Sequence, residues 1–239
     1  MEIRGVSLRR GANIILDDVS FTLEPGGVVV FGGRSGHGKS ALLEICAGLL
    51  KPSGGSVLWD GDDVACMSKY ELYGRRRSVG YVFQVHALIS NHSVFDNIAL
   101  PLRCGTSLTG GQVRKRVWSQ MEELGISREI ERKFPEALST AQLRSVAIAR
   151  ALVNSPALLM LDEPLSGIDP FTANTIIKVL HERWKRDRMS VIMATHSLSA
   201  WPEWSAGRFM LKDGRFGPAD GAFAPARDLR FNQRYSNAR

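Results

Sequence analysis

A glycine-rich segment near the start of the chain has the residue types and spacing that bind phosphate groups. It consists of Gly33, Arg34, Ser35, Gly36, His37, Gly38, Lys39 and Ser40. The segment fits the pattern G-x-x-x-x-G-K-[ST], in which glycines let the backbone curl so that several N–H groups point at phosphate oxygens. We therefore expect Lys39 to reach the β- and γ-phosphates of a nucleotide and the Ser40 hydroxyl to hold Mg²⁺.

Two adjacent carboxylates, Asp162 and Glu163, follow the apolar run at residues 158–161. Two carboxylates at the end of a buried strand are costly without a partner, and a metal ion supplies one. We expect Asp162 to bind Mg²⁺ through water and Glu163 to polarise the attacking water. A strand that simply meets solvent would give the same pattern, so this interpretation depends on the presence of Lys39.

Buried strands and a helix are needed to hold both motifs. Strand patterns occur at residues 6–8, 19–23, 28–31, 56–59, 81–83, 158–161 and 191–194, and helical patterns at 40–47, 113–124, 141–152 and 172–186. The run at 28–31 is apolar throughout, which is typical of a strand that is buried on both faces, and it precedes the glycine-rich segment. The order predicts an α/β core with a helical insertion at about 86–150. From about residue 213 periodicity is weak, so we expect this end to be loose or to depend on a partner.

Composition excludes several classes of protein. Hydrophobic residues make up 44% and charged residues 23%, as in a globular domain and unlike a disordered or fibrous chain. No apolar run approaches the ~20 residues that cross a bilayer, and no signal peptide is visible. The net charge is +7, but the run Arg75-Arg76-Arg77 has no interleaved aromatic residues, so a solvated face is expected and no nucleic-acid partner. The three cysteines contain no CxxC pair and predict neither a disulfide framework nor a metal site.

Four further segments accompany the two motifs. They are Tyr81-Val82-Phe83-Gln84, Leu138-Ser139-Thr140-Ala141-Gln142, Ser166-Gly167-Ile168-Asp169 and Thr195-His196. In this order the segments resemble those of the ATP-binding cassette (ABC) ATPases, over residues 1 to about 215. The resemblance implies an α/β fold of the ABC-type P-loop NTPase class, with a RecA-like core, an N-terminal antiparallel β subdomain and an inserted α-helical subdomain. It implies an ATPase domain over residues 1–215, a tail over 216–239, and hydrolysis of ATP with Mg²⁺.

The resemblance also implies roles for single residues. The implied catalytic residues are Glu163, Gln84 and the switch histidine His196. The implied metal ligands are Ser40, Gln84 and Asp162. Besides the glycine-rich segment, the implied nucleotide-binding residues are Arg10, Ser139, Gln142, Asp162 and Asp169. By the same resemblance, the segment around Ser139 caps the γ-phosphate bound to a second subunit.

The sequence departs from the family pattern at two places. Arg10 stands where the family has an aromatic residue that faces the nucleotide, and a guanidinium plane can still stack on adenine. Thr140 and Ala141 replace the two signature glycines, which removes room for close approach and access to positive φ. We expect slower hydrolysis rather than weaker nucleotide binding. Residues 108–112 (LTGGQ) look more like the family signature, but they lie too far before Asp162, and we interpret them as a loop and a helix start.

A narrower resemblance is carried by residues 67–73, 94–103 and 162–170. They are similar to the ATPase of Mce-associated phospholipid transporters, the maintenance-of-lipid-asymmetry type. This implies a peripheral subunit on the cytoplasmic face of the inner membrane. The implied partners are an integral membrane permease, a periplasmic Mce-type lipid-binding protein, and a second copy of the chain or a paralogous cassette. Two alternatives stay open: the ATPase of a lipoprotein-release or macrolide-export system, and a degenerate cassette with a structural or regulatory role.

Overall fold

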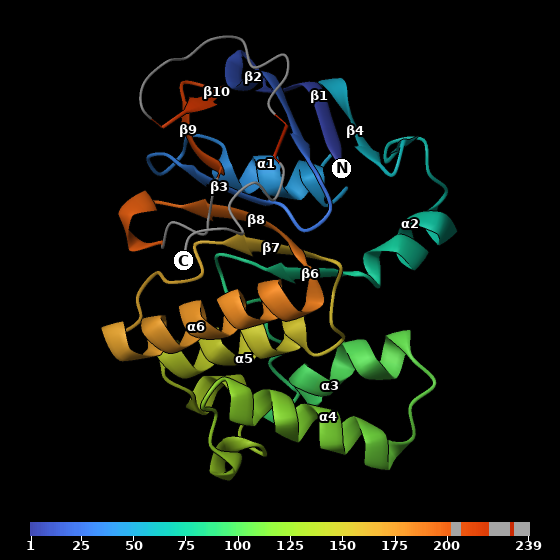
Figure 1. Ribbon diagram of the computed structural model, residues 1–239, viewed down its shortest axis with the longest axis vertical. Coiled ribbons are helices and arrows are strands. Elements are labelled where there is room, and N and C mark those ends of the chain that lie inside the picture. The colour runs from blue at the N-terminus through green and yellow to red at the C-terminus, as the bar shows by residue number, and fades with distance from the viewer. Residues whose placement is uncertain (202–206, 220–229, 232–239) are drawn as a thin grey trace.

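The computed structural model of the chain describes residues 1–201, 207–219 and 230–231, which form two β-sheets and a layer of helices (Figure 1). The larger sheet has the order β10-β9-β3-β8-β7-β6. Its strands are β3 (Val28–Gly32), β6 (Val79–Val82), β7 (Leu158–Asp162), β8 (Ser190–Thr195), β9 (Gly207–Lys212) and β10 (Arg215–Pro218). Every neighbouring pair is parallel except β9 with β10. The carboxyl ends of β3, β7 and β8 therefore meet at one edge of the sheet, where ligands of parallel sheets bind.

The smaller sheet has the order β11-β2-β1-β4-β5. Its strands are β1 (Glu2–Arg10), β2 (Asn13–Leu23), β4 (Gly54–Trp59), β5 (Asp62–Asp63) and β11 (Arg230–Phe231). Helix α1 (Lys39–Cys46) lies between the two sheets (Figure 1). Leu42 and Leu43 of this helix pack with Val29 and Phe31 of β3 and with Leu16 of β2 in one core cluster. This packing fixes the start of α1 against the edge of the larger sheet.

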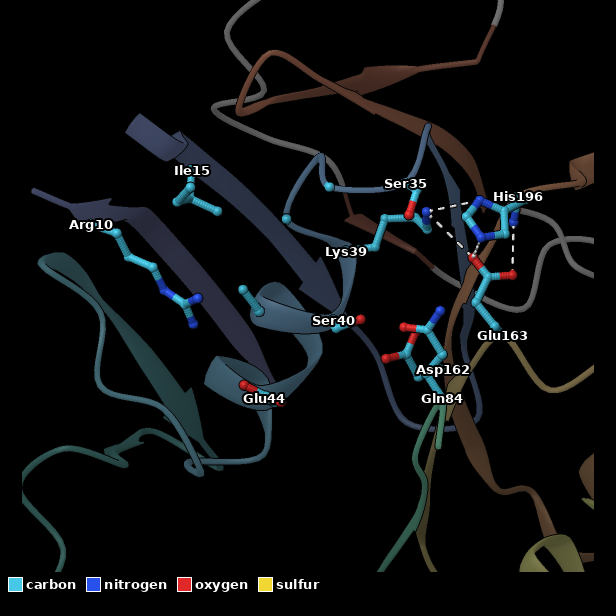
Figure 2. A pocket seen from close by; sticks show the side chains of 13 residues that line it. Arg10, Ile15, Ser35, Lys39, Ser40, Glu44, Gln84, Asp162, Glu163 and His196 are labelled. Carbon is cyan, nitrogen blue, oxygen red and sulfur yellow. Dashed lines mark hydrogen bonds and ion pairs between the residues drawn. The ribbon is translucent and has the colours of Figure 1, made fainter. Parts of the chain in front are cut away.

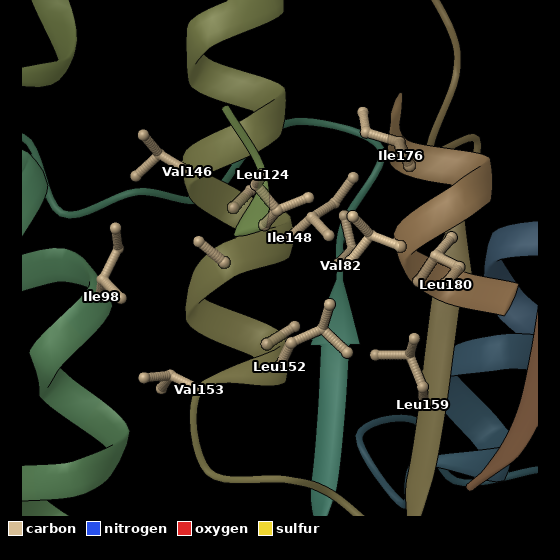
Figure 3. Close-up of a cluster of buried hydrophobic side chains, with 14 of the residues drawn as sticks. Val82, Ile98, Leu124, Val146, Ile148, Leu152, Val153, Leu159, Ile176 and Leu180 are labelled. Carbon is tan, nitrogen blue, oxygen red and sulfur yellow. The ribbon is translucent and has the colours of Figure 1, made fainter. Parts of the chain in front are cut away.

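Helices cover the opposite face of the larger sheet. They include α3 (Val94–Gly105), α4 (Gly110–Glu123), α5 (Thr140–Leu152) and α6 (Pro170–Asp187), with short 3₁₀ turns at Arg128–Ile130, Pro135–Ala137 and Leu198–Ala200. Ile148 and Leu152 of α5 point toward Val82 and Leu159 of the sheet, and Leu180 of α6 closes the same cluster (Figure 3). Helix α2 (Lys69–Arg76) lies at the side, next to β4 and β6 (Figure 1). In β3, Val28 and Val30 face these helices whereas Val29 and Phe31 face α1, so the prediction of a strand buried on both faces is confirmed.

Two parts of the structure differ from the sequence-based expectations. Helix α3 was not predicted as a separate element, although it lies within the predicted helical insertion. Its buried Asn97 ties its first turn to the carbonyls of Ile89 and His92 at 3.1 and 3.0 Å. The expectation of a loose chain from about residue 213 is wrong as far as Pro218. Strand β10 pairs with β9 there, and buried Phe216 stacks on Phe209 with ring centroids 4.8 Å apart. The tail that we expected over 216–239 lies mostly outside the described residues.

Candidate functional site

A cavity of about 250 Å³ lies beside the start of α1, at the edge where β7 and β8 end (Figure 2). Most of the residues predicted to bind nucleotide or metal line it. They are Arg10, Ser35, Gly36, Gly38, Lys39, Ser40, Gln84, Asp162, Glu163 and His196. These residues come from the first strands, the glycine-rich loop, α1 and the ends of β6, β7 and β8. The fold thus brings together segments that lie far apart in the sequence.

The start of α1 has no side-chain cap. The N-cap residue is Gly38, in a left-handed conformation with φ 89°. Because glycine has no side chain, it cannot accept a hydrogen bond from the N–H groups of the first turn. Each of the other α-helices in the described parts of the chain begins at Ser, Thr or Asp, whose side chain accepts a hydrogen bond from the first turn. The first N–H groups of α1 therefore lack the partner that the other helices supply for themselves. Such a helix start beside a cavity favours an anion.

Close approach of β9 explains a second glycine of the loop. A Cβ on Gly33, φ 156°, would lie 2.5 Å from the carbonyl oxygen of Leu211. No other residue fits this contact without moving the backbone. The ring of His37 also turns to β9, with Nδ1 3.3 Å from the same oxygen. Gly33, Arg34 and His37 therefore do not line the cavity, although the sequence pattern places them in the phosphate-binding segment.

Lys39 is buried at the centre of the loop. Its Nζ donates to the carbonyl oxygens of Gly33 at 2.8 Å and Arg34 at 3.2 Å. It also lies 3.3 Å from Oε1 of Glu163 and 3.2 Å from Nδ1 of His196 (Figure 2). These contacts fix the position of a compact positive charge, which is the group that a phosphate oxygen binds.

Glu163 is held between β7 and β8 by backbone contacts. Its residue has φ 49°, which is unusual for a side chain other than glycine, and its N–H donates to the carbonyl of Ala194 at 2.9 Å. The backbone N–H of His196 donates to Oε2 at 3.0 Å, and Nε2 of the same histidine lies 3.1 Å from Oε1. Nδ1 of the ring lies 3.2 Å from Nζ of Lys39 and 3.3 Å from the carbonyl oxygen of Gly33. This network orients the Glu163 carboxylate at the wall of the cavity.

Asp162 and Ser40 have the properties of a Mg²⁺ site. Oδ1 of Asp162 is buried and has no hydrogen-bond partner. Burial raises the pKa of the Asp162 carboxyl, and the Ser40 hydroxyl and the charges of Lys39 and Arg144 offset this rise only in part. In the described parts of the chain no group of three His, Cys, Asp or Glu could hold a metal alone. Mg²⁺ commonly uses one or two protein oxygens together with water and substrate phosphates, so these residues fit it.

Three further predicted nucleotide-binding residues do not line the cavity, and each helps to begin a helix. Oγ of Ser139 accepts from the N–H of Gln142 at 3.3 Å, and Oε1 of Gln142 accepts from the N–H of Ser139 at 2.9 Å. Oδ1 of Asp169 accepts from the N–H of Thr172 at 2.9 Å, and this bonding lowers the pKa of the Asp169 carboxyl.

The segment at 108–112 begins α4, as predicted from its position. Thr109 and Gln112 form the same reciprocal cap that Ser139 and Gln142 form at α5. Thr140 and Ala141 lie in the first turn of α5, outside the set of residues with positive φ. At both positions the backbone is therefore ordinary helix, and the added side-chain volume is what the structure shows in place of glycine.

Sequence reasoning missed three residues that line the cavity, Ile15, Ala41 and Glu44. Ile15 lies in β2 beside the loop, with Cγ2 3.0 Å from the place where a Cβ on Gly38 would stand. The apolar run at residues 14–16 was the available signal, but we predicted a strand only from residue 19. Ile15 and Arg10 together form the wall next to the first strands (Figure 2).

A parallel sheet, a glycine-rich loop before α1 and an acidic pair after β7 define a P-loop nucleotide-hydrolysing protein. The sequence model of a family described as ABC transporter matches residues 16–166, and the chain belongs to this family as an ATP-binding cassette with ATPase activity. No helix in the described parts of the chain is long and apolar enough to cross a membrane.

The chain is similar to two groups of Escherichia coli proteins at the same level. It is 34% identical to the cell division ATP-binding protein FtsE of strain K12 over 204 residues, 85% of this chain and 90% of FtsE. It is also 34% identical to the intermembrane phospholipid transport system ATP-binding protein MlaF over 198 residues, 83% of this chain and 73% of MlaF.

Among solved structures, the dimeric ATP-binding cassette MJ0796 bound to ADP and Pi has a TM-score of 0.83 and 29% identity. That similarity covers 91% of this chain and 97% of MJ0796. The cassette cbiO1 of Clostridium perfringens has a TM-score of 0.76 and 31% identity, over 90% of this chain and 86% of that one. The fold predicted from the sequence is confirmed.

Proposed function

We propose that this ATPase works as one of a pair of cassettes that energise a membrane permease, with phospholipid as cargo. The observation that supports the catalytic part is the arrangement in one cavity of Lys39, Asp162 and Glu163. Lys39 lies at an uncapped helix start, Asp162 fits Mg²⁺, and Glu163 is oriented by His196. Together they supply charge compensation, a metal ligand and a base.

Each residue then has a defined part in hydrolysis. Lys39 and the first N–H groups of α1 bind the β- and γ-phosphates. Glu163 accepts a proton from water while the water oxygen attacks the γ-phosphorus and the bond to the ADP oxygen breaks. The backbone N–H of His196 keeps the carboxylate oriented. When bound, Mg²⁺ neutralises phosphate charge, and Ser40, Asp162 and Gln84 would hold it.

The start of α5 would complete the site of a second subunit. Its cap uses a lone pair of the Ser139 hydroxyl, because the N–H of Gln142 is the donor. The hydroxyl hydrogen therefore stays available for a γ-phosphate oxygen of the partner. The dimeric structure of MJ0796 supports a paired arrangement for this similar chain.

Replacing Glu163 with glutamine tests the catalytic assignment. The amide keeps the shape of the side chain but cannot accept a proton, so we expect turnover to fall by about 100-fold or more while ATP stays bound. Steady-state ATPase activity and nucleotide binding are the measurements, and Glu182→Gln on the exposed side of α6 is the matched control. Hydrolysis at the parent rate in Glu163→Gln would show that another group is the base.

The cargo is the finer part of the proposal. Phospholipid is supported by the stretches 67–73, 94–103 and 162–170 and by the similarity to MlaF, while the equal similarity to FtsE supports a cell-division role as the second candidate. Co-purification with the membrane subunits followed by mass spectrometry of bound lipid separates them. Enriched phospholipid and an Mce-type protein in the complex would support the first. A lipid-free complex would favour the second, or a lipoprotein-release or macrolide-export system.

We propose that residues 84–103 form the surface that contacts the permease. Val85 is 79% exposed and is the large apolar side chain that this segment presents to solvent, which supports this placement. Val94 is fully buried and belongs to the core instead. Val85→Glu should therefore abolish co-purification with the permease without unfolding the chain. Intact assembly would place the contact elsewhere.

A further inference from the structure

Helix α5 is tied to the segment that carries Gln84 by a buried arginine. Arg144 is 2% exposed, and its two terminal nitrogens donate to the carbonyl oxygens of Phe83 and Gln84, both at 3.1 Å. These two residues directly follow β6. The guanidinium thus grips the backbone at the residue whose side chain enters the nucleotide cavity.

A second arginine of the same helix holds the next part of the segment. Arg150 donates to the carbonyl oxygens of Ala87 at 2.8 Å and His86 at 3.4 Å. In the described structure no backbone-to-backbone hydrogen bond beyond the regular elements involves residues 84–88, and Ala87 has a positive φ of 48°. The path of this segment therefore depends on the two arginines of α5 rather than on its own backbone bonding.

Arg144 lies near the acidic pair of the site, although no ion pair joins them among the described residues. Burial lowers the pKa of its guanidinium, and the nearby carboxylates of Asp162 and Glu163 act in the opposite direction. Its hydrogen-bond partners are neutral carbonyls, and its buried Nε has no partner. A buried cation in such a place is costly unless carboxylates offset it, which points to a role beyond packing of the helix.

We propose that Arg144 is a positioning residue that fixes where the Gln84 side chain enters the cavity and makes that position depend on α5. The inference rests on the proposed function, because there Gln84 is a metal-holding residue and the start of α5 faces the nucleotide of a second subunit. When the start of α5 contacts that nucleotide, a shift of α5 moves the Arg144 guanidinium. This in turn moves Gln84, the proposed metal-holding residue of the chain's own site. Arg150, which holds only His86 and Ala87, provides an internal comparison.

The alternative is that Arg144 merely stabilises the packing of α5. A double-mutant cycle in the ATPase assay separates the two roles, with Arg144→Gln, Gln84→Ala and their combination, and with Arg150→Gln as the matched control. We expect Arg144→Gln to lower kcat and raise the Mg²⁺ concentration for half-maximal activity by about tenfold. The double variant Arg144→Gln with Gln84→Ala should lose no more activity than the more impaired of the two single variants. In the double variant Arg150→Gln with Gln84→Ala, the fold-losses of the two single variants should multiply.

Hydrogen exchange of the backbone amides at 84–87 gives a second readout that needs no turnover. It should rise in Arg144→Gln at Gln84, and Arg144→Lys, which keeps the charge but not the planar fork, should fall between parent and Gln variant. If Arg144→Gln does not fold, Arg144→Lys replaces it in the double-mutant cycle. Multiplying effects of Arg144→Gln and Gln84→Ala, or unchanged exchange at Gln84, would overturn the proposal. Failure of the proposed function would show separately, as parent-rate hydrolysis in Glu163→Gln.

Discussion

Helices α1 and α5 both begin at proposed phosphate contacts, yet their first turns are built in opposite ways. The start of α1 has glycine in place of a cap, a buried lysine and two buried carboxylates nearby. The start of α5 satisfies itself, since Ser139 and Gln142 cap each other's N–H groups. The first arrangement leaves unpaired donors that favour an anion, and the second is stable without one.

This difference shows which half of the proposed composite site is stable in the absence of nucleotide. In the proposed arrangement the α1 half binds nucleotide within the chain, so its loss should remove binding. In the same arrangement the α5 half meets phosphate only after two subunits come together, so a self-capped start keeps that helix intact when its surface faces water. Changes at α5 should therefore affect turnover and helix stability more than nucleotide affinity.

Removing the charge of the α1 half should have the largest effect. In Lys39→Ala the phosphates lose their buried counter-charge, and we expect ATP affinity or turnover to fall by about 100-fold or more. The variant also leaves Glu163 buried without its ion pair, which costs stability by about 3 kcal/mol. Calorimetric titration with ATP and thermal unfolding measure the two effects.

Two control variants separate charge loss from destabilisation in this experiment. Lys178→Ala removes an exposed lysine on α6, whose pair with Glu182 at 4.0 Å is worth little, and should change neither quantity. Lys39→Ala combined with Glu163→Gln should recover stability but not ATP binding. Parent-like binding in Lys39→Ala would show that the glycine-rich loop is not the phosphate site.

Removing the cap of the α5 half should have an intermediate effect. Ser139→Ala loses both the cap and the proposed donor to the partner's phosphate, so we expect about tenfold slower turnover and about 1 kcal/mol lower stability. Thr109→Ala removes the equivalent cap of α4 and should cost similar stability with no change in turnover. Equal turnover in the two variants would contradict a role for Ser139 at the nucleotide.

The phosphate half of the site could be predicted from local sequence, and the other half could not. Gly33 to Ser40 and Asp162 follow buried apolar runs, so a short window contains both the motif and its support. The two caps at Thr109 and Ser139 are locally identical, and only the distance to Asp162 told them apart. The local sequence predicts the same capped helix start for both segments, whereas their position in the fold determines which of them is proposed to contact a nucleotide.

Other features depend on contacts that no window contains. Helix α3 contains Pro101, and its buried Asn97 binds carbonyls that lie before the helix. Strand β10 follows a stretch without periodicity, yet Phe216 stacks on Phe209 and on Phe21 from another sheet. Arg144 binds the carbonyl oxygens of Phe83 and Gln84, which lie about sixty positions away in the sequence. The local sequence therefore indicated only an arginine in a helix.

Exchanging glycines between the two matching helix starts should have the smallest effect and sharpens the comparison most. Thr140→Gly with Ala141→Gly makes room at the start of α5, where the structure shows ordinary helical backbone, so any gain must come from closer approach of a phosphate. We expect turnover of the assembled complex to rise a fewfold, while stability falls by about 0.5–1 kcal/mol for each glycine.

The mirror variant, Gly110→Ala with Gly111→Ala, changes α4 where a Cβ at either position meets nothing within 4 Å. It should stabilise the chain by a similar amount and leave turnover unchanged. Steady-state ATPase activity and thermal unfolding of both pairs decide the matter, because the effects on turnover and stability have opposite signs only in α5. If the α5 pair hydrolyses ATP more slowly than the parent, Thr140 and Ala141 suit the partner's nucleotide better than glycine does, and their volume is part of the site.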